Sequence, residues 1–186
     1  MLLVTLGWGS WAFYKNQMQE LRQQVEEELT TISTLKARQI EGWRKERLAD
    51  AAVLMDNPFW VAEVKQGLIQ PKSIVSKQIM ARLYSLHQRY GCYDVLLIKP
   101  DGQIAFSLQK RTGRINIKLD NNIQQAIAWH QPVLSDIHLD SLYPFPHVNL
   151  IGPLFAETAE NSSPVAVVIF VMDMRQSFYP MLQAWP

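Results

Sequence analysis

Apolar residues recur at helical spacing through the first third of the chain. Residues 16–57 contain no proline and one glycine, Gly42, and strong helix formers dominate the segment. We therefore predict one long helix here, with its apolar side chains gathered into a single stripe. This apolar stripe comprises Leu21, Val25, Leu29, Ile32, Leu35, Ile40, Trp43, Ala51 and Leu54.

Two shorter helices are predicted to follow the long one. Asn57 precedes Pro58, and a residue before proline avoids helical dihedral angles, so the long helix should end there. Pro58 suits the first turn of the next helix. Another helix is predicted from Ser73, as its cap, to about Tyr90, where Gly91 closes it.

After Gly91 the apolar positions form short runs that are typical of strands. The first run ends in a Pro-Asp-Gly turn at 100–102, which suits a hairpin. A helix capped by Asp120 interrupts the strands, and a last helix follows Asp173, which we interpret as a cap and not as a ligand-binding group. The strands are predicted at 92–99, 103–108, 132–140, 147–156 and 163–173.

The connections between these strands decide the fold class. Short connections join antiparallel neighbours, because a parallel crossover needs a dozen or more residues. We therefore predict an α+β fold, in which a long N-terminal helix precedes a five-stranded antiparallel sheet flanked by helices.

The charge balance excludes a protein whose whole surface binds nucleic acid. The chain has a formal net charge of +1 at pH 7 and 48% hydrophobic residues, as globular domains do. The basic segment 35–51 interleaves its cations with Glu41, Glu46 and Asp50, which favours a solvated helix face. Arg47 and Asp50 are spaced to form an ion pair. We predict no nucleic-acid partner.

The N-terminal run from Met1 to Tyr14 carries no charge and ends at Lys15. It is shorter than the roughly 20 apolar residues that span a bilayer. Trp8, Trp11 and Tyr14 gather toward Lys15, as aromatic residues do where a membrane helix reaches the lipid headgroups. We predict the end of a transmembrane helix that begins upstream. The alternative is an apolar helix packed in a soluble core.

The order of these elements resembles that of the extracytoplasmic PAS-like sensor domains called Cache domains. Three local motifs carry the resemblance further: LKARQIEGWRKERLADA at 35–51, VLLIKPDGQIAFS at 95–107 and VVIFVMDMRQSFYPMLQAWP at 167–186. The resemblance implies a periplasmic receptor module on the cell inner membrane, which dimerises through its long helix. It also implies an output domain, a histidine kinase first and a diguanylate cyclase or chemoreceptor as alternatives.

The resemblance divides the chain into three parts. Residues 1–15 are expected to be the end of the transmembrane helix, and residues 16–57 the long stalk and dimerisation helix. Residues 58–186 are expected to form the PAS-like Cache sensor domain, the membrane-distal lobe of a larger receptor.

No enzyme signature is present in the sequence. There is no phosphate-binding glycine loop, no GxSxG motif and no HExxH motif, so neither catalysis nor a cofactor is predicted. The single cysteine, Cys92, is interpreted as a buried thiol. The histidines lack the short paired spacing of a zinc site, so no metal is predicted; they are His87, His130, His138 and His147.

Two groups of polar residues are candidates for ligand binding. If residues 133–140 form a strand, Asp136, His138 and Asp140 share one face and can hold an ammonium group, a polyamine or a divalent cation. The alternative is an edge strand with its polar face in water. Arg111 and Arg114 can clamp a carboxylate through paired hydrogen bonds, or else lie in solvent.

In Cache domains the ligand pocket lies between the sheet and the loop and helix after the first hairpin. The amino-acid-binding members place an arginine before a Trp-Tyr pair there, and RTGRINI has the arginines without the aromatic pair. Tyr93 and Lys99 share a face of the first strand by spacing and can also face this pocket. Core packing for Tyr93 and a turn-edge position for Lys99 are the alternatives.

These residues favour a sensor domain without enzymatic activity. We expect it to bind a small organic acid, amine or amino acid and to pass the signal through its long helix. The competing hypothesis is a structural dimerisation module, with sensing left to another lobe or a partner protein. An open pocket favours the first hypothesis and a sealed core the second.

Overall fold

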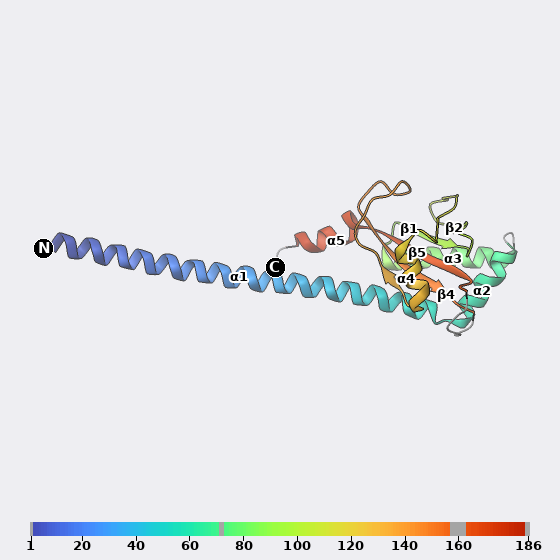
Figure 1. The fold of residues 1–186 in the computed structure, drawn as a ribbon, viewed down its shortest axis with the longest axis horizontal. Helices are drawn as coiled ribbons and strands as arrows, with labels where there is room; N and C mark the ends of the chain where they lie inside the picture. Colours follow the sequence, from blue (N-terminus) through green and yellow to red (C-terminus); the bar gives the residue numbers. More distant parts are fainter. Residues whose placement is uncertain (1, 71–72, 157–162, 185–186) are drawn as a thin grey trace. The chain divides into compact units, whose positions relative to one another are not determined.

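The computed structural model describes residues 2–70, 73–156 and 163–184. It confirms the α+β class, with a long N-terminal helix and a five-stranded antiparallel sheet (Figure 1). In chain order the elements are α1 (Leu2–Met55), α2 (Pro58–Ile69), α3 (Ile74–Tyr90), β1 (Asp94–Ile98), β2 (Ile104–Ser107), α4 (Asn121–Trp129), β3 (Val133–Leu134), β4 (His147–Leu154), β5 (Ala166–Asp173) and α5 (Met174–Gln183).

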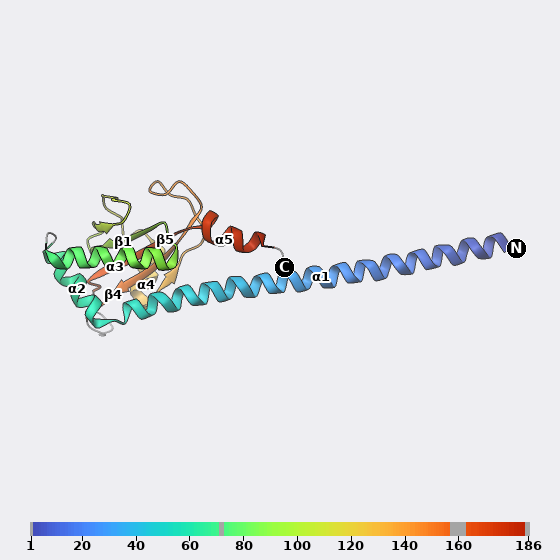
Figure 2. The same ribbon diagram turned by 180° about the vertical axis from the view of Figure 1, so that it is seen from behind.

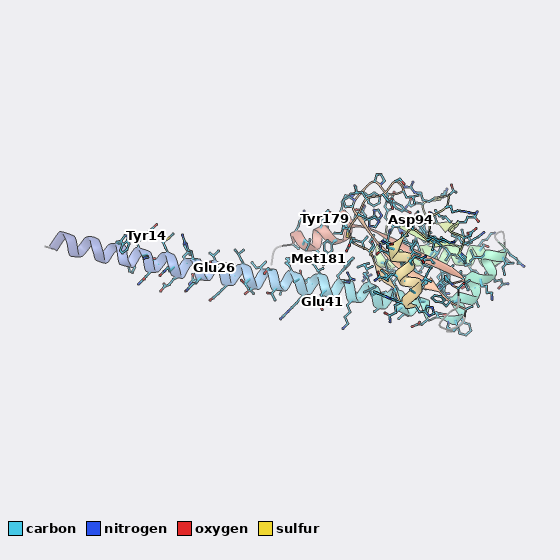
Figure 3. All side chains as sticks on the ribbon, viewed as in Figure 1. Tyr14, Glu26, Glu41, Asp94, Tyr179 and Met181 are labelled. Carbon is cyan, nitrogen blue, oxygen red and sulfur yellow. The ribbon has the colours of Figure 1, made fainter. Side chains whose placement is uncertain are left out.

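Helix α1 extends beyond the segment that its apolar pattern predicts, because it begins at Leu2. The chain forms two compact units, one made by α1 up to Trp43 and one that begins at Arg44. In the first unit the apolar stripe lies open, with Leu21 55% and Leu29 54% exposed. Figure 3 shows side chains that project from this part of α1 on all sides. In the described ranges no helix holds an apolar stretch long enough to cross a bilayer.

The predicted caps and breaks occur where the local sequence places them. Asn57 and Pro58 separate α1 from α2, and the Asn57 side chain accepts the backbone N–H of Trp60 at 3.0 Å. Ser73 caps α3, and Gly91 closes it in the left-handed conformation, with φ of 60°. Asp120 caps α4 by accepting two backbone N–H groups. Each of these signals is local, so each could be predicted without tertiary information.

The sheet has the strand order β2-β1-β5-β4-β3, and every neighbouring pair is antiparallel, as predicted. Strands β1 and β5 lie side by side although they are far apart in sequence, with Asp94 opposite Val171 and Ile98 opposite Val167. Every residue of β5 is buried, because helices or loops cover both faces of the central strands.

Helices α3 and α4 lie on opposite faces of the sheet (Figures 1 and 2). On the α3 face, Tyr90 meets Phe170 edge to face, with ring centroids 6.0 Å apart. Arg47 from the last part of α1 forms the predicted ion pair with Asp50 at 3.4 Å and lies 5.4 Å from the Tyr90 ring. Cys92 is buried as expected, and burial raises the pKa of its thiol to about 12.

An apolar cluster fills the space between the sheet and α4. Helix α4 contributes Ile123 and Ala126, and neither is exposed. The cluster comprises Leu96, Ile98, Ile104, Ile117, Ile123, Ala126, Val133, Tyr143, Phe145, Ile151, Val167, Ile169 and Val171. The middle of this face is therefore a packed apolar core, and the buried polar side chains lie at its edge.

The third strand is much shorter than predicted. We expected residues 132–140, but β3 ends at Leu134, and one isolated bridge between His138 and His147 follows it. The Ser135 hydroxyl donates a hydrogen bond to the backbone carbonyl of Asp136 at 2.9 Å. Nδ1 of His138 donates a hydrogen bond to the same carbonyl at 2.8 Å. Such side-chain bonds to the local backbone compete with a regular strand ladder, which explains the early end.

Candidate functional site

Buried polar side chains gather at one end of the sheet, on the face that carries α4. Asp94 begins β1, His147 begins β4 and Asp173 ends β5. The antiparallel register brings them together, because Asp94 pairs with Val171 and His147 with Asp173. We call this region, with the loop residues that contact it, the polar end of the sheet.

Asp94 is fully buried, and its carboxylate is saturated with hydrogen bonds. Oδ1 accepts the backbone N–H groups of Leu108 at 3.0 Å and Gln109 at 3.2 Å. Oδ2 accepts the hydroxyl groups of Ser107 at 2.9 Å and Tyr143 at 2.7 Å. A buried carboxylate needs such donors to remain stable. Asp94 therefore fixes both the loop after β2 and the Tyr143 loop to β1.

Aromatic rings cover this carboxylate and attract a cation. Tyr93 meets Phe145 at 4.8 Å and Tyr143 at 6.0 Å between ring centroids. The guanidinium group of Arg111 lies 5.2 Å from the Tyr143 ring, and its backbone N–H donates to Ser107 Oγ at 3.0 Å. Burial and the hydrogen bond to Asp94 raise the pKa of Tyr143, so it remains a neutral donor. No carboxylate among the described residues pairs with Arg111.

A second arginine at the polar end is already paired. Arg175 donates Nε to Asp173 Oδ1 at 3.0 Å and Nη2 to Oδ2 at 2.7 Å, and it lies 4.7 Å from the Phe145 ring. These hydrogen bonds hold the pKa of Asp173 below its usual value. Asp173 also accepts the backbone N–H of Arg175 and caps α5, as predicted.

The structure divides the predicted site residues between the two ends of the sheet. Tyr93 and Arg111 both contact the Tyr143 ring at the polar end. His138 contacts His147 there, with ring centroids 4.2 Å apart. Asp136 is exposed and contributes its backbone carbonyl to His138.

The other two candidates lie at the hairpin end. Lys99 Nζ donates to Gln103 Oε1 at 2.9 Å within the β1–β2 turn. Arg114 forms an exposed ion pair with Asp101 at 3.3 Å. Neither side chain joins Arg111, so the predicted two-arginine clamp does not form.

Three residues of the polar end escaped the sequence interpretation. Asp94 is the only acidic residue in the apolar run CYDVLLIK. An acidic residue is rarely buried in a strand without a partner, so this position could have been identified from the sequence. Tyr143 lies in an irregular loop and gives no such signal. His147 acquires its neighbours through strand pairing with Asp173 and the bridge to His138, nine positions earlier.

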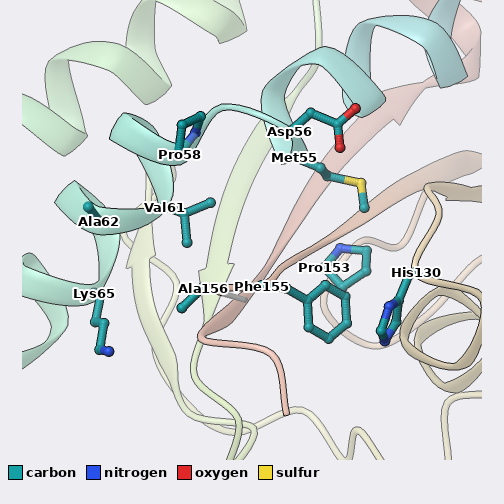
Figure 4. Close-up of a pocket in the computed structure, with 10 residues that line it drawn as sticks. All are labelled: Met55, Asp56, Pro58, Val61, Ala62, Lys65, His130, Pro153, Phe155 and Ala156. Carbon is teal, nitrogen blue, oxygen red and sulfur yellow. The ribbon is translucent and has the colours of Figure 1, made fainter. Parts of the chain in front are cut away.

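A separate open cleft of about 560 Å³ lies near the opposite end of β4 (Figure 4). Met55 and Asp56 line it from the end of α1, and Lys65 lines it from α2. On the far wall the His130 and Phe155 rings lie 4.1 Å apart. The volume suits a small ligand. Its charged groups are fewer and more exposed than those at the polar end.

Comparison with solved structures identifies the fold. No family model matches the sequence, and no curated protein matches it either. The sensory domain of the Campylobacter jejuni chemoreceptor Tlp3 with isoleucine bound matches with a TM-score of 0.64 and 14% identity, over 84% of this chain and 62% of that one. This chain therefore spans less than two thirds of the Tlp3 domain.

Two further structures agree. The ligand-binding domain of the Pseudomonas aeruginosa amino acid chemoreceptor PctC, in complex with GABA, has a TM-score of 0.59 and 15% identity over 87% of this chain and 69% of that one. The Escherichia coli DcuS sensor domain has a TM-score of 0.51 and 18% identity over 73% and 91%. The chain thus shares the fold of these sensor and ligand-binding domains, as its element order predicted.

Proposed function

We propose that this chain is the extracytoplasmic ligand-sensing domain of a transmembrane signalling receptor, and that it binds a small anionic solute at the polar end of the sheet. The fold shared with chemoreceptor and DcuS sensor domains supports the sensing role. The single observation that carries the site is Arg111, a half-buried cation held against an aromatic ring without a carboxylate partner among the described residues.

The geometry favours a carboxylate over an amine. Arg111 offers planar, paired donors that match a carboxylate. Its backbone is fixed through Ser107 to Asp94, so little order is lost when a solute binds. The carboxylate of Asp173, a group that attracts amines, is already paired with Arg175. Organic acids and amino acids are therefore the expected solutes.

The packing of β5 supports a route for the signal. Asp173 belongs to the polar end, while Phe170 in the same strand packs against Tyr90 on the opposite face. Tyr90 in turn contacts Arg47 of α1. A solute that binds one packing of β5 more tightly than another shifts the balance between them, and α1 carries the difference toward the membrane. A histidine kinase is the proposed output, with a diguanylate cyclase or a chemoreceptor as alternatives.

A thermal-shift screen of organic acids, amines and amino acids tests this proposal. A solute at about 100 times its Kd adds about 2.7 kcal/mol, which raises Tm by roughly 5–10 °C in a domain of this size. Arg111→Ala should weaken the active solute by about 10- to 100-fold, because a hydrogen bond to a charged group contributes about 1.5–3 kcal/mol.

Arg114→Ala is the matched control, since it removes an arginine from the same loop that lies at the hairpin end. It should leave the affinity unchanged. Equal losses in the two variants, or a screen in which no compound stabilises the chain, would contradict the site.

A second candidate function, a dimerisation module, also has support. Four residues of the apolar stripe, Leu21, Val25, Leu29 and Leu35, are exposed to solvent in the single chain, and the apolar cluster under α4 is packed. We propose a homodimer through residues 16–57, anchored at the membrane by residues 1–15. The two functions are compatible, because a receptor that dimerises through α1 can also sense.

The dimer predicts a specific loss. Leu21→Lys with Leu29→Lys should weaken self-association by at least about 100-fold in sedimentation equilibrium, since each buried leucine contributes about 1.5–3 kcal/mol. The control pair, Gln23→Lys with Thr34→Lys, adds the same charge on the other side of the helix and should have little effect. A chain that is monomeric at every concentration would refute the interface.

A further inference from the structure

Three possible metal ligands converge beside the polar end. His138, Asp140 and His147 each offer a ligand atom, and all these atoms lie within 4.8 Å of one another. The antiparallel bridge between His138 and His147 brings the two rings together, with their centroids 4.2 Å apart and their planes tilted by 56°. The group joins the Tyr143 loop to the first residue of β4, so its backbone is held by the sheet.

The hydrogen bonds place the lone pair on the same nitrogen of both rings. Nδ1 of His138 lies 2.8 Å from the carbonyl of Asp136, and Nδ1 of His147 lies 2.9 Å from the carbonyl of Phe145. A carbonyl only accepts, so each Nδ1 carries the proton and each Nε2 keeps a lone pair. A backbone carbonyl on Nδ1 is the usual orienting partner of a histidine that binds metal through Nε2.

Nε2 of His147 points into the group without a hydrogen bond. It is fully buried, and no described residue donates to it or accepts from it. Asp140 Oδ2 lies 3.5 Å from it. A buried polar atom left in this state is costly. Its position indicates that a bound species completes the group.

Asp140 is oriented for the same purpose. Its Oδ1 accepts the backbone N–H of Tyr143 at 2.6 Å, which leaves Oδ2 toward His147. Ligands on a tetrahedral Zn²⁺ ion, with bonds of about 2.0–2.1 Å, lie roughly 3.3 Å apart, close to the observed 3.5 Å. Nε2 of His138 lies 3.3 Å from the side-chain nitrogen of Asn149, a contact that a metal would replace.

We propose that His138, Asp140 and His147 bind a divalent transition-metal ion of the Zn²⁺ class, through two Nε2 atoms and one carboxylate oxygen. Two imidazoles and one carboxylate suit Zn²⁺, Ni²⁺ or Co²⁺ and do not suit Ca²⁺ or Mg²⁺, which prefer oxygen ligands. Asp140 is exposed and provides the entry path. Three protein ligands leave a fourth position for water.

Metal titration of the metal-free chain tests the proposal. Competition with a chromophoric chelator should show one Zn²⁺ ion per chain, and Co²⁺ should give the visible absorption bands of a tetrahedral site. His147→Gln and Asp140→Asn should each weaken Zn²⁺ binding by at least about 100-fold, because loss of an outer-shell partner alone costs about 10- to 100-fold. Ca²⁺ and Mg²⁺ should not compete.

His130→Gln is the matched control, since His130 lies at the separate cleft. It should retain full affinity for Zn²⁺. If the wild-type chain and Asp140→Asn bind Zn²⁺ equally, or if the wild type binds none, the site does not exist. Asp140 is exposed, so this variant decides the question even if His147→Gln fails to fold.

Discussion

Replacing Asp94 with alanine should lower the free energy of unfolding by about 3–5 kcal/mol, the largest effect of any single carboxylate in the described part of the chain. The substitution removes the acceptor of five donors: the backbone N–H groups of Val95, Leu108 and Gln109 and the hydroxyl groups of Ser107 and Tyr143. Each buried donor without a partner costs about 1–3 kcal/mol, and local rearrangement recovers part of the sum. Urea denaturation measures the loss.

Two control variants separate the role of Asp94 from the loss of a carboxylate or of one donor. Asp136→Ala removes a carboxylate from an exposed position and should change stability by less than about 0.5 kcal/mol. Tyr143→Phe removes one donor and keeps the ring, so it should cost about 1–2 kcal/mol. A loss in Asp94→Ala no larger than that in Asp136→Ala would show that Asp94 does not fix these loops.

The second large effect is expected at Gly102, in the turn between β1 and β2. Its φ of +86° strains any other residue, and an added Cβ would overlap the backbone carbonyl oxygen of Ile115. That carbonyl cannot move freely, because the N–H of Ile115 donates to the carbonyl of Gly102 at 2.8 Å. Gly102→Ala should therefore cost about 2–4 kcal/mol in thermal or urea unfolding.

Gly91→Ala separates the two causes. Gly91 also has a positive φ, +60°, but a Cβ there meets nothing within 4 Å. Its substitution should cost only about 1–2 kcal/mol, the left-handed backbone penalty. Equal losses at Gly91 and Gly102 would mean that the contact with Ile115 relaxes and only the backbone conformation matters.

Most of the fold could be predicted because its signals are local. Pro58, Ser73, Gly91 and Asp120 mark helix ends through their own backbone chemistry, and the structure has helix ends at all four. The five strands followed from short apolar runs, and their antiparallel pairing from short connections. The exception is the strand predicted at 132–140, where side-chain bonds of Ser135 and His138 replace the ladder.

The candidate site was less accessible to sequence reasoning, because sequence separation does not report which end of a sheet a residue occupies. Arg111 and Arg114 are three positions apart, yet one stacks on Tyr143 and the other pairs with Asp101. His138 and His147 lack a recognisable metal-binding spacing and are joined only by strand register. Register and loop path are tertiary properties, so these contacts could not be read from spacing alone.

We propose that an anionic solute binds at Arg111 on the polar end of the sheet. Nuclear magnetic resonance of the labelled chain, titrated with a carboxylate that raises its Tm, tests this most directly. We expect the largest chemical-shift changes to cluster at Tyr93, Arg111 and Tyr143. Changes centred instead on the cleft of Lys65 and His130 (Figure 4), with Arg111 unaffected, would contradict it.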